Sequence, residues 1–342
     1  MLGAMTQSMT AQVRLKSRPD GIPTPEHFEI VTAPLPPLGD GQILVRNDFL
    51  SVEPAMRGWV SAVANYSDPV GIGEVMRAFA AGEVVASRHP KFAEGDRVMG
   101  MFGWQNYAIV DAGAVTRKIA EHDLPLSLSL GILGLNGITA YFGLLDVGRP
   151  RAGDTVVVST AAGAVGSAVG QIAKIAGCRT IGIAGGPAKT KMCLDEFGYD
   201  AALDYKAKDF EAALMQACGA GVNVYFDNTA GAISDAVLAK LALHARVVIC
   251  GTAAVASWSP PPLGPRVERH LLVKRASMAG FIIFDYAPRY EEAIARLADW
   301  VRERKLRYRE DIQDGIEACP GAIARLYRGD NLGKSLIRLR HG

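Results

Sequence analysis

Residues 153–285 alternate between short apolar runs and longer segments with helical spacing. The runs are rich in β-branched residues and lie at 155–159, 179–184, 201–204, 222–227, 246–250 and 278–284. Amphipathic helices are expected at 167–176, 188–197, 209–218 and 234–242. Several runs are apolar throughout, as expected when helices cover both faces of a parallel sheet. The pattern predicts an α/β fold with a doubly wound, six-stranded parallel sheet.

The chain on either side of this region has a different pattern. Residues 12–125 carry short apolar runs separated by Gly, Pro and Asp, which predicts a β-rich domain. These runs lie at 42–46, 80–86, 97–101 and 107–110. Helical spacing of small and apolar residues follows at 130–148, and a mixed-charge segment at 288–305 predicts a helix packed on one side. Residues 307–342 return to short elements and end in a strand-like run at 335–339.

A glycine motif follows the first strand of the predicted parallel sheet. Its spacing, Ala161-x-Gly163-x-x-Gly166, is that of the dinucleotide-binding fingerprint, with Ala161 in place of the first glycine. Backbone N–H groups at a helix N-terminus suit a pyrophosphate, because that end of a helix carries partial positive charge. The motif predicts a nucleotide-dependent enzyme and places its cofactor in the second half of the chain.

The end of the second strand bears on the choice of cofactor. In NAD-binding proteins this strand usually ends in Asp or Glu, which accepts hydrogen bonds from the adenosine ribose. Here the strand ends at Ala184, and the next charged residue is Lys189. A carboxylate would repel a 2′-phosphate whereas a lysine attracts it, so we expect NADPH rather than NADH. Taken alone, Lys189 would fit better as a solvated residue in the first turn of a helix.

Composition excludes some classes of function. The 342 residues are 49% hydrophobic and 21% charged with a net charge of +2, which gives no argument for nucleic acid or an anionic membrane as a partner. No apolar run approaches the roughly 20 residues that span a bilayer, and the start of the chain lacks the pattern of a signal peptide. The five cysteines are scattered without a C-x-x-C pair, which favours a cytoplasmic location over a disulfide framework.

The sequence also predicts chemistry without a metal. Catalytic zinc needs three ligands, usually His, Cys or Glu. Residues 1–130 contain no cysteine, and none of the six histidines pairs there with a nearby Cys or a His-Glu dipeptide. Simple alcohol oxidation is disfavoured, because a developing alkoxide would lack a Lewis acid.

Several segments together resemble the zinc-independent medium-chain dehydrogenase/reductases. They read LGLNGITAYFGLLDVG, VVVSTAAGAVGSAVGQIAK, GCRTIGIAGG, VYFDNTAG and GDNLGK. Within this family the chain is similar to the prostaglandin reductases (leukotriene 12-hydroxydehydrogenase-like), the NADPH-dependent alkenal/one oxidoreductases and, through KLRYREDIQDGIEACP, the bacterial curcumin reductases. The resemblance runs from about residue 18 to residue 339. It implies a GroES-like catalytic domain at 1–130 that returns at 307–342, a Rossmann NADPH-binding domain at 131–306, and a homodimer.

The resemblance also implies a cofactor site. Ala164, Val165, Gly166 and Ser167, with Gly163, are expected to line the pyrophosphate, and Lys189 and Tyr205 to contact the 2′-phosphate end beside Gly185. The rest of the cofactor is expected against Thr139, Asn228, Cys250, Gly251, Phe281 and Asn331. Other readings stay open: Asn228 could cap the next helix, Phe281 could be core, and Asn331 could form a turn beside Gly333. Cys250 is expected as a small buried residue with a backbone contact, not as a reactive thiol.

The implied reaction is reduction of a carbon–carbon double bond conjugated to a carbonyl. Hydride goes to the β-carbon, negative charge moves to the carbonyl oxygen as an enolate, and the α-carbon is protonated. The protein must orient the alkene and offer a donor to the enolate oxygen. We expect a small apolar α,β-unsaturated carbonyl substrate, with neither nucleic acid nor membrane as a partner.

The substrate site departs from the family pattern in two places. Relatives often read SVDPYMRG where residues 51–58 read SVEPAMRG, so an aromatic wall becomes Ala55, while Arg57 is expected to be structural. Relatives also carry a tyrosine soon after the Cys-Gly pair, but no tyrosine occurs between Tyr225 and Tyr286. We expect a wider, more apolar pocket that includes Ala55, Ala256 and Trp258.

One tyrosine and two tryptophans remain as candidates at this site. Tyr66 matches a tyrosine of the bacterial curcumin reductases and is the first candidate for the enolate donor; the alternative is a loop aromatic packed on the Rossmann domain. Trp104 and Trp258 could stack on a flat substrate or belong to the core or rim. Two other functions stay open: a metal-free NADPH quinone oxidoreductase, and an NADPH-binding sensor or partner-binding protein with little turnover.

Overall fold

The computed structural model describes residues 9–62, 67–255, 260 and 262–341. The chain forms two compact units. Met1–Leu130 and Glu310–Gly342 make the first, which we call the β-rich unit. Gly131–Arg309 make the second, which we call the α/β unit.

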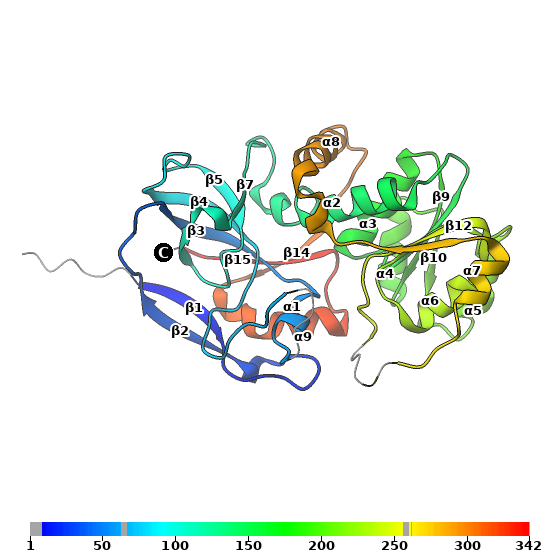
Figure 1. Ribbon diagram of the computed structural model, residues 1–342, viewed down its shortest axis with the longest axis horizontal. Helices are drawn as coiled ribbons and strands as arrows, with labels where there is room; N and C mark the ends of the chain where they lie inside the picture. Colours follow the sequence, from blue (N-terminus) through cyan, green and yellow to red (C-terminus); the bar gives the residue numbers. More distant parts are fainter. Residues whose placement is uncertain (1–8, 63–66, 256–259, 261, 342) are drawn as a thin grey trace, which may run out of the picture. The chain divides into compact units, whose positions relative to one another are not determined.

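A parallel six-stranded sheet forms the centre of the α/β unit (Figure 1). Its order is β10-β9-β8-β11-β12-β13, which in sequence order is the 3-2-1-4-5-6 arrangement of doubly wound folds. The strands are β8 (Thr155–Ser159), β9 (Arg179–Ala184), β10 (Ala201–Asp204), β11 (Val222–Asp227), β12 (Leu241–Ile249) and β13 (Ser277–Gly280). The predicted α/β fold is confirmed, and the first four strands have the predicted bounds.

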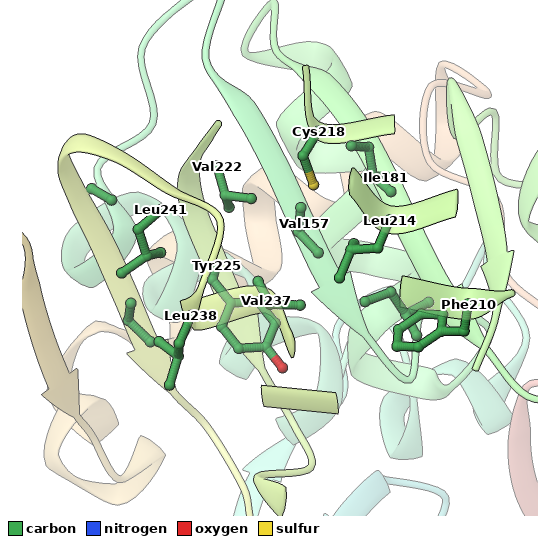
Figure 2. Packing of buried hydrophobic residues seen from close by; sticks show 13 residues of the cluster. Val157, Ile181, Phe210, Leu214, Cys218, Val222, Tyr225, Val237, Leu238 and Leu241 are labelled. Carbon is green, nitrogen blue, oxygen red and sulfur yellow. The ribbon is translucent and has the colours of Figure 1, made fainter. Parts of the chain in front are cut away.

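Helices cover both faces of this sheet, which is why its central strands are largely apolar. They are α2 (Leu135–Phe142), α3 (Ala164–Ile175), α4 (Pro187–Asp195), α5 (Phe210–Cys218), α6 (Gly231–Leu238), α7 (Glu268–Lys274) and α8 (Tyr290–Arg302), with the π-helical η4 (Gly143–Gly148) and the 3-10 helix η5 (Ile283–Arg289). Val157 of β8 is buried in a cluster with Leu214 of α5 and Val237 of α6 (Figure 2). Val156 and Val158 are also fully buried and point to the opposite face, because successive strand residues alternate.

Several predicted elements differ from the structure, among them the fifth strand, which begins at Leu241 rather than at residue 246. The helix predicted at 234–242 begins earlier, at Gly231, and Leu241 already belongs to β12, because it is buried opposite Val222 in the sheet. The strand predicted at 278–284 ends at Gly280. Gly280 pairs with Ile249, the last residue of β12, so the chain beyond it has no parallel partner and continues into η5.

The β-rich unit contains a seven-stranded sheet and a separate hairpin-like pair. The large sheet follows the order β14-β15-β3-β4-β5-β7, and β6 pairs with β3. Its strands are β3 (Gln42–Ser51), β4 (Ala80–Ser87), β5 (Arg97–Gly100), β6 (Tyr107–Asp111), β7 (Val115–Lys118), β14 (Glu310–Asp314) and β15 (Lys334–Arg338). The pair is β1 (Met9–Leu15) with β2 (Phe28–Pro34). The helical pieces are η1 (Pro25–His27), α1 (Met56–Trp59), η2 (Ala112–Ala114), η3 (Leu126–Leu130), η6 (Ile316–Ala318) and α9 (Cys319–Arg328).

The C-terminal segment belongs to this unit because β15 pairs antiparallel with β3, placing Leu336 opposite Ser51. The sequence anticipates β15 but not α9, whose apolar residues Cys319, Ala322 and Ile323 are buried. In the part of the chain that the structure describes, we find no helix with the length and apolar character needed to cross a membrane.

Candidate active site

Small residues let α3 approach the end of β8 closely. A Cβ atom on Gly166 would lie 2.2 Å from the carbonyl oxygen of Thr160, and one on Gly170 would lie 2.1 Å from the ring of Tyr199. The Tyr199 hydroxyl donates to the carbonyl oxygen of Gly166 at 2.7 Å. Thr160 itself has φ of 54°, a left-handed conformation that is rare for a β-branched residue and typical of functional turns. The turn is therefore built as a close strand-to-helix crossing.

This crossing leaves a helix N-terminus open to a ligand. Gly163 is the N-cap of α3, and Gly163, Ala164 and Val165 are half-buried, whereas Gly166 and Ser167 are buried. The Ser167 hydroxyl faces the carbonyl oxygen of Ala164 at 3.4 Å. The first amides of a helix have no acceptor within it and favour an anion. A pyrophosphate therefore fits against Gly163–Val165, with Gly166 and Ser167 behind them in the packing.

The loop after β9 lies against the residue that follows β10. A Cβ atom on Gly185 would lie 2.9 Å from the ring of Tyr205, so only glycine lets that ring rest on the backbone. Gly186 has φ of 90°, and its amide donates to Asp204 Oδ1 at 2.9 Å. Lys206 donates its amide to the same oxygen, and these bonds hold the pKa of Asp204 below its ordinary value. The sequence analysis missed Asp204, a carboxylate from the neighbouring strand that orders this loop.

Two cationic side chains and a cavity lie near this loop. Lys189 is half-buried in the first turn of α4, where its amide donates to Gly186. Lys206 Nζ lies 5.9 Å from the centre of the Tyr205 ring. Beside Tyr205 is a cavity of about 750 Å³. It is lined by residues after β10 and by the start of α6, among them Lys208, Phe210, Ala232 and Ile233.

A buried carboxylate organises the ends of β8 and β11. Asp227 is 2% exposed, and its Oδ1 accepts from the Tyr225 hydroxyl at 3.0 Å and from the amides of Thr229 and Ala230 at 2.9 and 3.0 Å. Ser234 donates to Oδ2. Burial raises the pKa of Tyr225 well above its ordinary value. The carboxylate thus lies in a well-partnered network at the point where the strand order reverses.

Asn228 is fixed to β8 and does not cap the next helix. Its amide donates to Ser159 Oγ at 2.8 Å and its Nδ2 to the Ser159 carbonyl oxygen at 2.7 Å. The N-cap of α6 is Ala230, which has no side-chain cap bond. The capping alternative is therefore wrong, and Asn228 lies at the carboxyl ends of the strands, where ligands of such sheets bind.

The backbone after β12 is hydrogen-bonded to Asp227 at the end of β11. The Asp227 carbonyl oxygen accepts from the amides of Cys250 and Gly251 at 2.8 and 3.1 Å. Desolvation raises the pKa of the Cys250 thiol to about 12, so the thiol stays protonated and unreactive at neutral pH.

A Cβ atom on Gly143 would lie 2.5 Å from Phe281, so that ring packs closely on η4. Thr139 is half-buried on α2.

In the β-rich unit, the predicted substrate-side residues lie on a loop that ends β3. Ala55 is half-buried there, and the Arg57 guanidinium lies 4.5 Å above the Tyr327 ring. Trp104 is fully buried and donates from Nε1 to the Ser51 carbonyl oxygen at 3.2 Å. Trp104 is therefore core and cannot stack on a substrate.

Of the remaining predicted residues, the structure describes Asn331 but not Tyr66, Ala256 and Trp258. Asn331 is buried, and its Nδ2 donates to the Gly333 carbonyl oxygen at 2.8 Å, as a turn-forming residue does. Tyr66, Ala256 and Trp258 lie outside the described residues. Among the residues that are described, no group of three or more His, Cys, Asp and Glu could hold a metal ion.

Comparisons with known proteins agree with this geometry. Residues 11–118 match the N-terminal domain of oxidoreductase, and residues 164–299 match a family described as zinc-binding dehydrogenase. The chain is 42% identical to the NADPH-dependent curcumin reductase of Escherichia coli, over 95% of each protein. It is 39% identical to prostaglandin reductase 1 of Rattus norvegicus, over 95% of this chain and 97% of that protein. CurA from Vibrio vulnificus, solved in complex with NADPH, has a TM-score of 0.90 at 41% identity, covering 97% of this chain and 100% of CurA.

Proposed function

The chain belongs to the zinc-independent medium-chain dehydrogenase/reductases, in the group of the curcumin and prostaglandin reductases, and on this premise we propose that it reduces the C=C bond of α,β-unsaturated ketones and aldehydes with NADPH. The observation that carries the proposal is the similarity to curcumin reductase over 95% of the chain. When bound, NADPH supplies the hydride that adds to the β-carbon. Two solved quinone oxidoreductases of the same fold are only 19% and 22% identical, so they add no argument for a quinone substrate.

The cofactor would be held mainly by the α/β unit. The first amides of α3, at Ala164 and Val165, suit the pyrophosphate beside Gly163. Lys189 and Tyr205 suit the 2′-phosphate end at the loop that Asp204 orders. Asn228, Cys250 and Gly251 follow the carboxyl ends of β11 and β12, where ligands of such sheets bind. Thr139, Phe281 and Asn331 complete the set that we propose.

The chain itself would stabilise the charge that develops on the substrate oxygen. We assign the donor role to Tyr66, because it matches a tyrosine of the bacterial curcumin reductases. The tyrosine that other relatives carry after the Cys-Gly pair is absent here. A donor aimed at the enolate oxygen stabilises the transition state more than the substrate. Water delivers the final proton to the α-carbon. We propose Ala55, Ala256 and Trp258 for substrate binding, and the small side chains at 55 and 256 would favour wide, apolar substrates.

Turnover with a panel of substrates tests this function. We expect NADPH oxidation with enones and enals, and the saturated ketone or aldehyde as product by mass spectrometry. Turnover of quinones alone would make the enzyme a quinone reductase. NADPH binding by fluorescence without oxidation of any compound would make the protein a sensor.

Tyr66→Phe tests the donor role. Loss of one such donor costs about 10²–10³ in rate, so kcat/KM for an enone should fall by that factor. The dissociation constant of NADPH, measured by fluorescence, should stay unchanged and serves as the control for folding. An unchanged kcat/KM would assign the donor to another group.

We also propose a homodimer that forms at the edge of the α/β sheet. Within the described residues, β13 pairs only with β12, and its sequence Ser-Met-Ala-Gly carries no charge. Large apolar side chains are exposed around it: Leu272, Val273, Ile282 and Phe284. In the β-rich unit, by contrast, the edge strand β14 carries Asp311 and Asp314 in ion pairs, which discourage pairing with another strand. A second copy of this chain is therefore the expected occupant of the β13 edge.

A cytoplasmic location is consistent with the cysteines. All five are free, and four of them are buried. A protein of this size without disulfides suits a reducing compartment. We therefore place the enzyme in the cytoplasm.

A further inference from the structure

Lys334 is a buried lysine with three hydrogen-bond acceptors around its ammonium group. Its side chain is 5% exposed. Nζ donates to Ser51 Oγ at 2.6 Å, to the Val52 carbonyl oxygen at 3.1 Å and to Glu53 Oε1 at 2.7 Å. An ammonium group has three hydrogens, so these bonds use its full donor capacity. All three acceptors lie where β3 ends and the loop carrying Ala55 begins.

The same C-terminal segment holds this loop at two further points. The Tyr327 hydroxyl donates to the Pro54 carbonyl oxygen at 2.8 Å. The Arg57 guanidinium stacks on the Tyr327 ring at 4.5 Å. Tyr327 and Lys334 therefore contact the loop on both sides of Ala55.

The C-terminal segment that contacts the loop also contains Asn331. The conformation of this segment is fixed by the bond from Asn331 to Gly333 and by Asp311, which accepts from the Leu332 amide at 2.9 Å. Arg325 holds Asp311 through two bonds of 3.0 Å. One rigid turn thus connects a residue proposed for the cofactor with the loop proposed for the substrate.

We propose that Lys334 is a positioning residue that sets the loop of residues 51–57 for substrate binding. The proposal rests on the proposed function only for the substrate role of Ala55. Removing the ammonium would remove three bonds from Nζ to residues 51–53, including the ion pair with Glu53, whose side chain is 15% exposed. The loop of residues 51–57 would then change its conformation and displace Ala55, whereas β15 would stay paired with β3 and β14.

Lys334→Met tests this role, because methionine keeps much of the length without the charge. We expect KM for an enone to rise about tenfold or more, since small misplacement of a substrate-contacting group is costly. Because every bond from Nζ ends on residues 51–53, kcat should change less than KM, and the Kd of NADPH should stay within about twofold. Adding Glu53→Gln to Lys334→Met should reverse part of the rise in KM, since it removes the charge that Lys334 balances in the wild-type protein.

A readout without substrate separates this proposal from the proposed function. Hydrogen exchange at the amides of residues 51–60 should become faster in Lys334→Met even if the wild-type protein reduces no enone. The matched control is Lys118→Met, which removes an exposed lysine paired with Asp96 in the same unit and should change neither KM nor exchange at 51–60. If Lys334→Met does not fold, Tyr327→Phe removes only the hydroxyl and should raise KM in the same direction. Unchanged exchange and KM in a folded variant, or equal losses of NADPH and enone binding, would overturn the proposal.

Discussion

At the residue scale, the difference between NADPH and NADH depends on a few side chains after β9. The absence of an acid at Ala184 is visible in the sequence, but Asp204 is not, because it comes from the neighbouring strand. Its carboxylate is occupied by the amides of Gly186 and Lys206. This acid therefore shapes the loop, and Lys189 is the residue that we propose for the 2′-phosphate.

Lys189→Ala should therefore raise KM for NADPH about tenfold or more while changing KM for NADH little, since a charge-assisted phosphate contact is among the stronger polar contacts. Steady-state kinetics with both cofactors measure the ratio. Lys191→Ala is the matched control: this lysine is two residues away, exposed, and paired with Asp195 at 2.5 Å. Equal effects of Lys189→Ala on the two cofactors would contradict its assignment to the 2′-phosphate.

Single residues also mark the limits of sequence analysis at the site. Gly163 and Gly166 can be identified from the sequence because their spacing is local. Lys189 can be identified because the acid expected at the end of β9 is missing. Ser159, Asp227 and Lys334 are not readable in this way. The bond between Ser159 and Asp227 spans 68 positions and the bond between Lys334 and Ser51 spans 283, so only the folded topology brings these pairs together.

At the element scale, hydrophobic pattern predicts the central strands well because both faces of each are buried. It fails where a strand depends on its neighbour. Residues 281–284 are apolar enough for a strand, yet β12 ends at Ile249 and leaves them unpaired. The hydrophobic pattern also misses the short helices α7 and α9. Their positions depend on packing, of α7 on β12 and of α9 within the β-rich unit.

The edge strand β13 leads to a prediction about assembly. The double substitution Ile282→Lys and Phe284→Glu should convert a dimer into a monomer, because it places charges on an apolar edge. Light scattering after size exclusion measures the mass. Leu194→Lys, an exposed apolar position on α4, is the control and should leave the dimer intact. A wild-type monomer, or a double variant that remains dimeric, would place the interface elsewhere or remove it.

At the scale of the whole molecule, the chain combines a doubly wound nucleotide fold with a β-rich unit built from both ends of the sequence. The pairing of β15 with β3 brings Lys334 and Tyr327 to the loop of residues 51–57. The membership of the family follows from motifs spread over the whole chain. The identity of the natural substrate does not, because specificity depends on the side chains that differ from relatives, above all Ala55.

The most direct test of the central claim follows the hydride itself. NADPH carrying deuterium at both C4 positions is incubated with an enone and the enzyme in ordinary water, and the product is analysed by NMR. The account predicts the saturated ketone with one deuterium on the β-carbon and a solvent hydrogen on the α-carbon. Deuterium on the former carbonyl carbon, in an allylic alcohol, would contradict it.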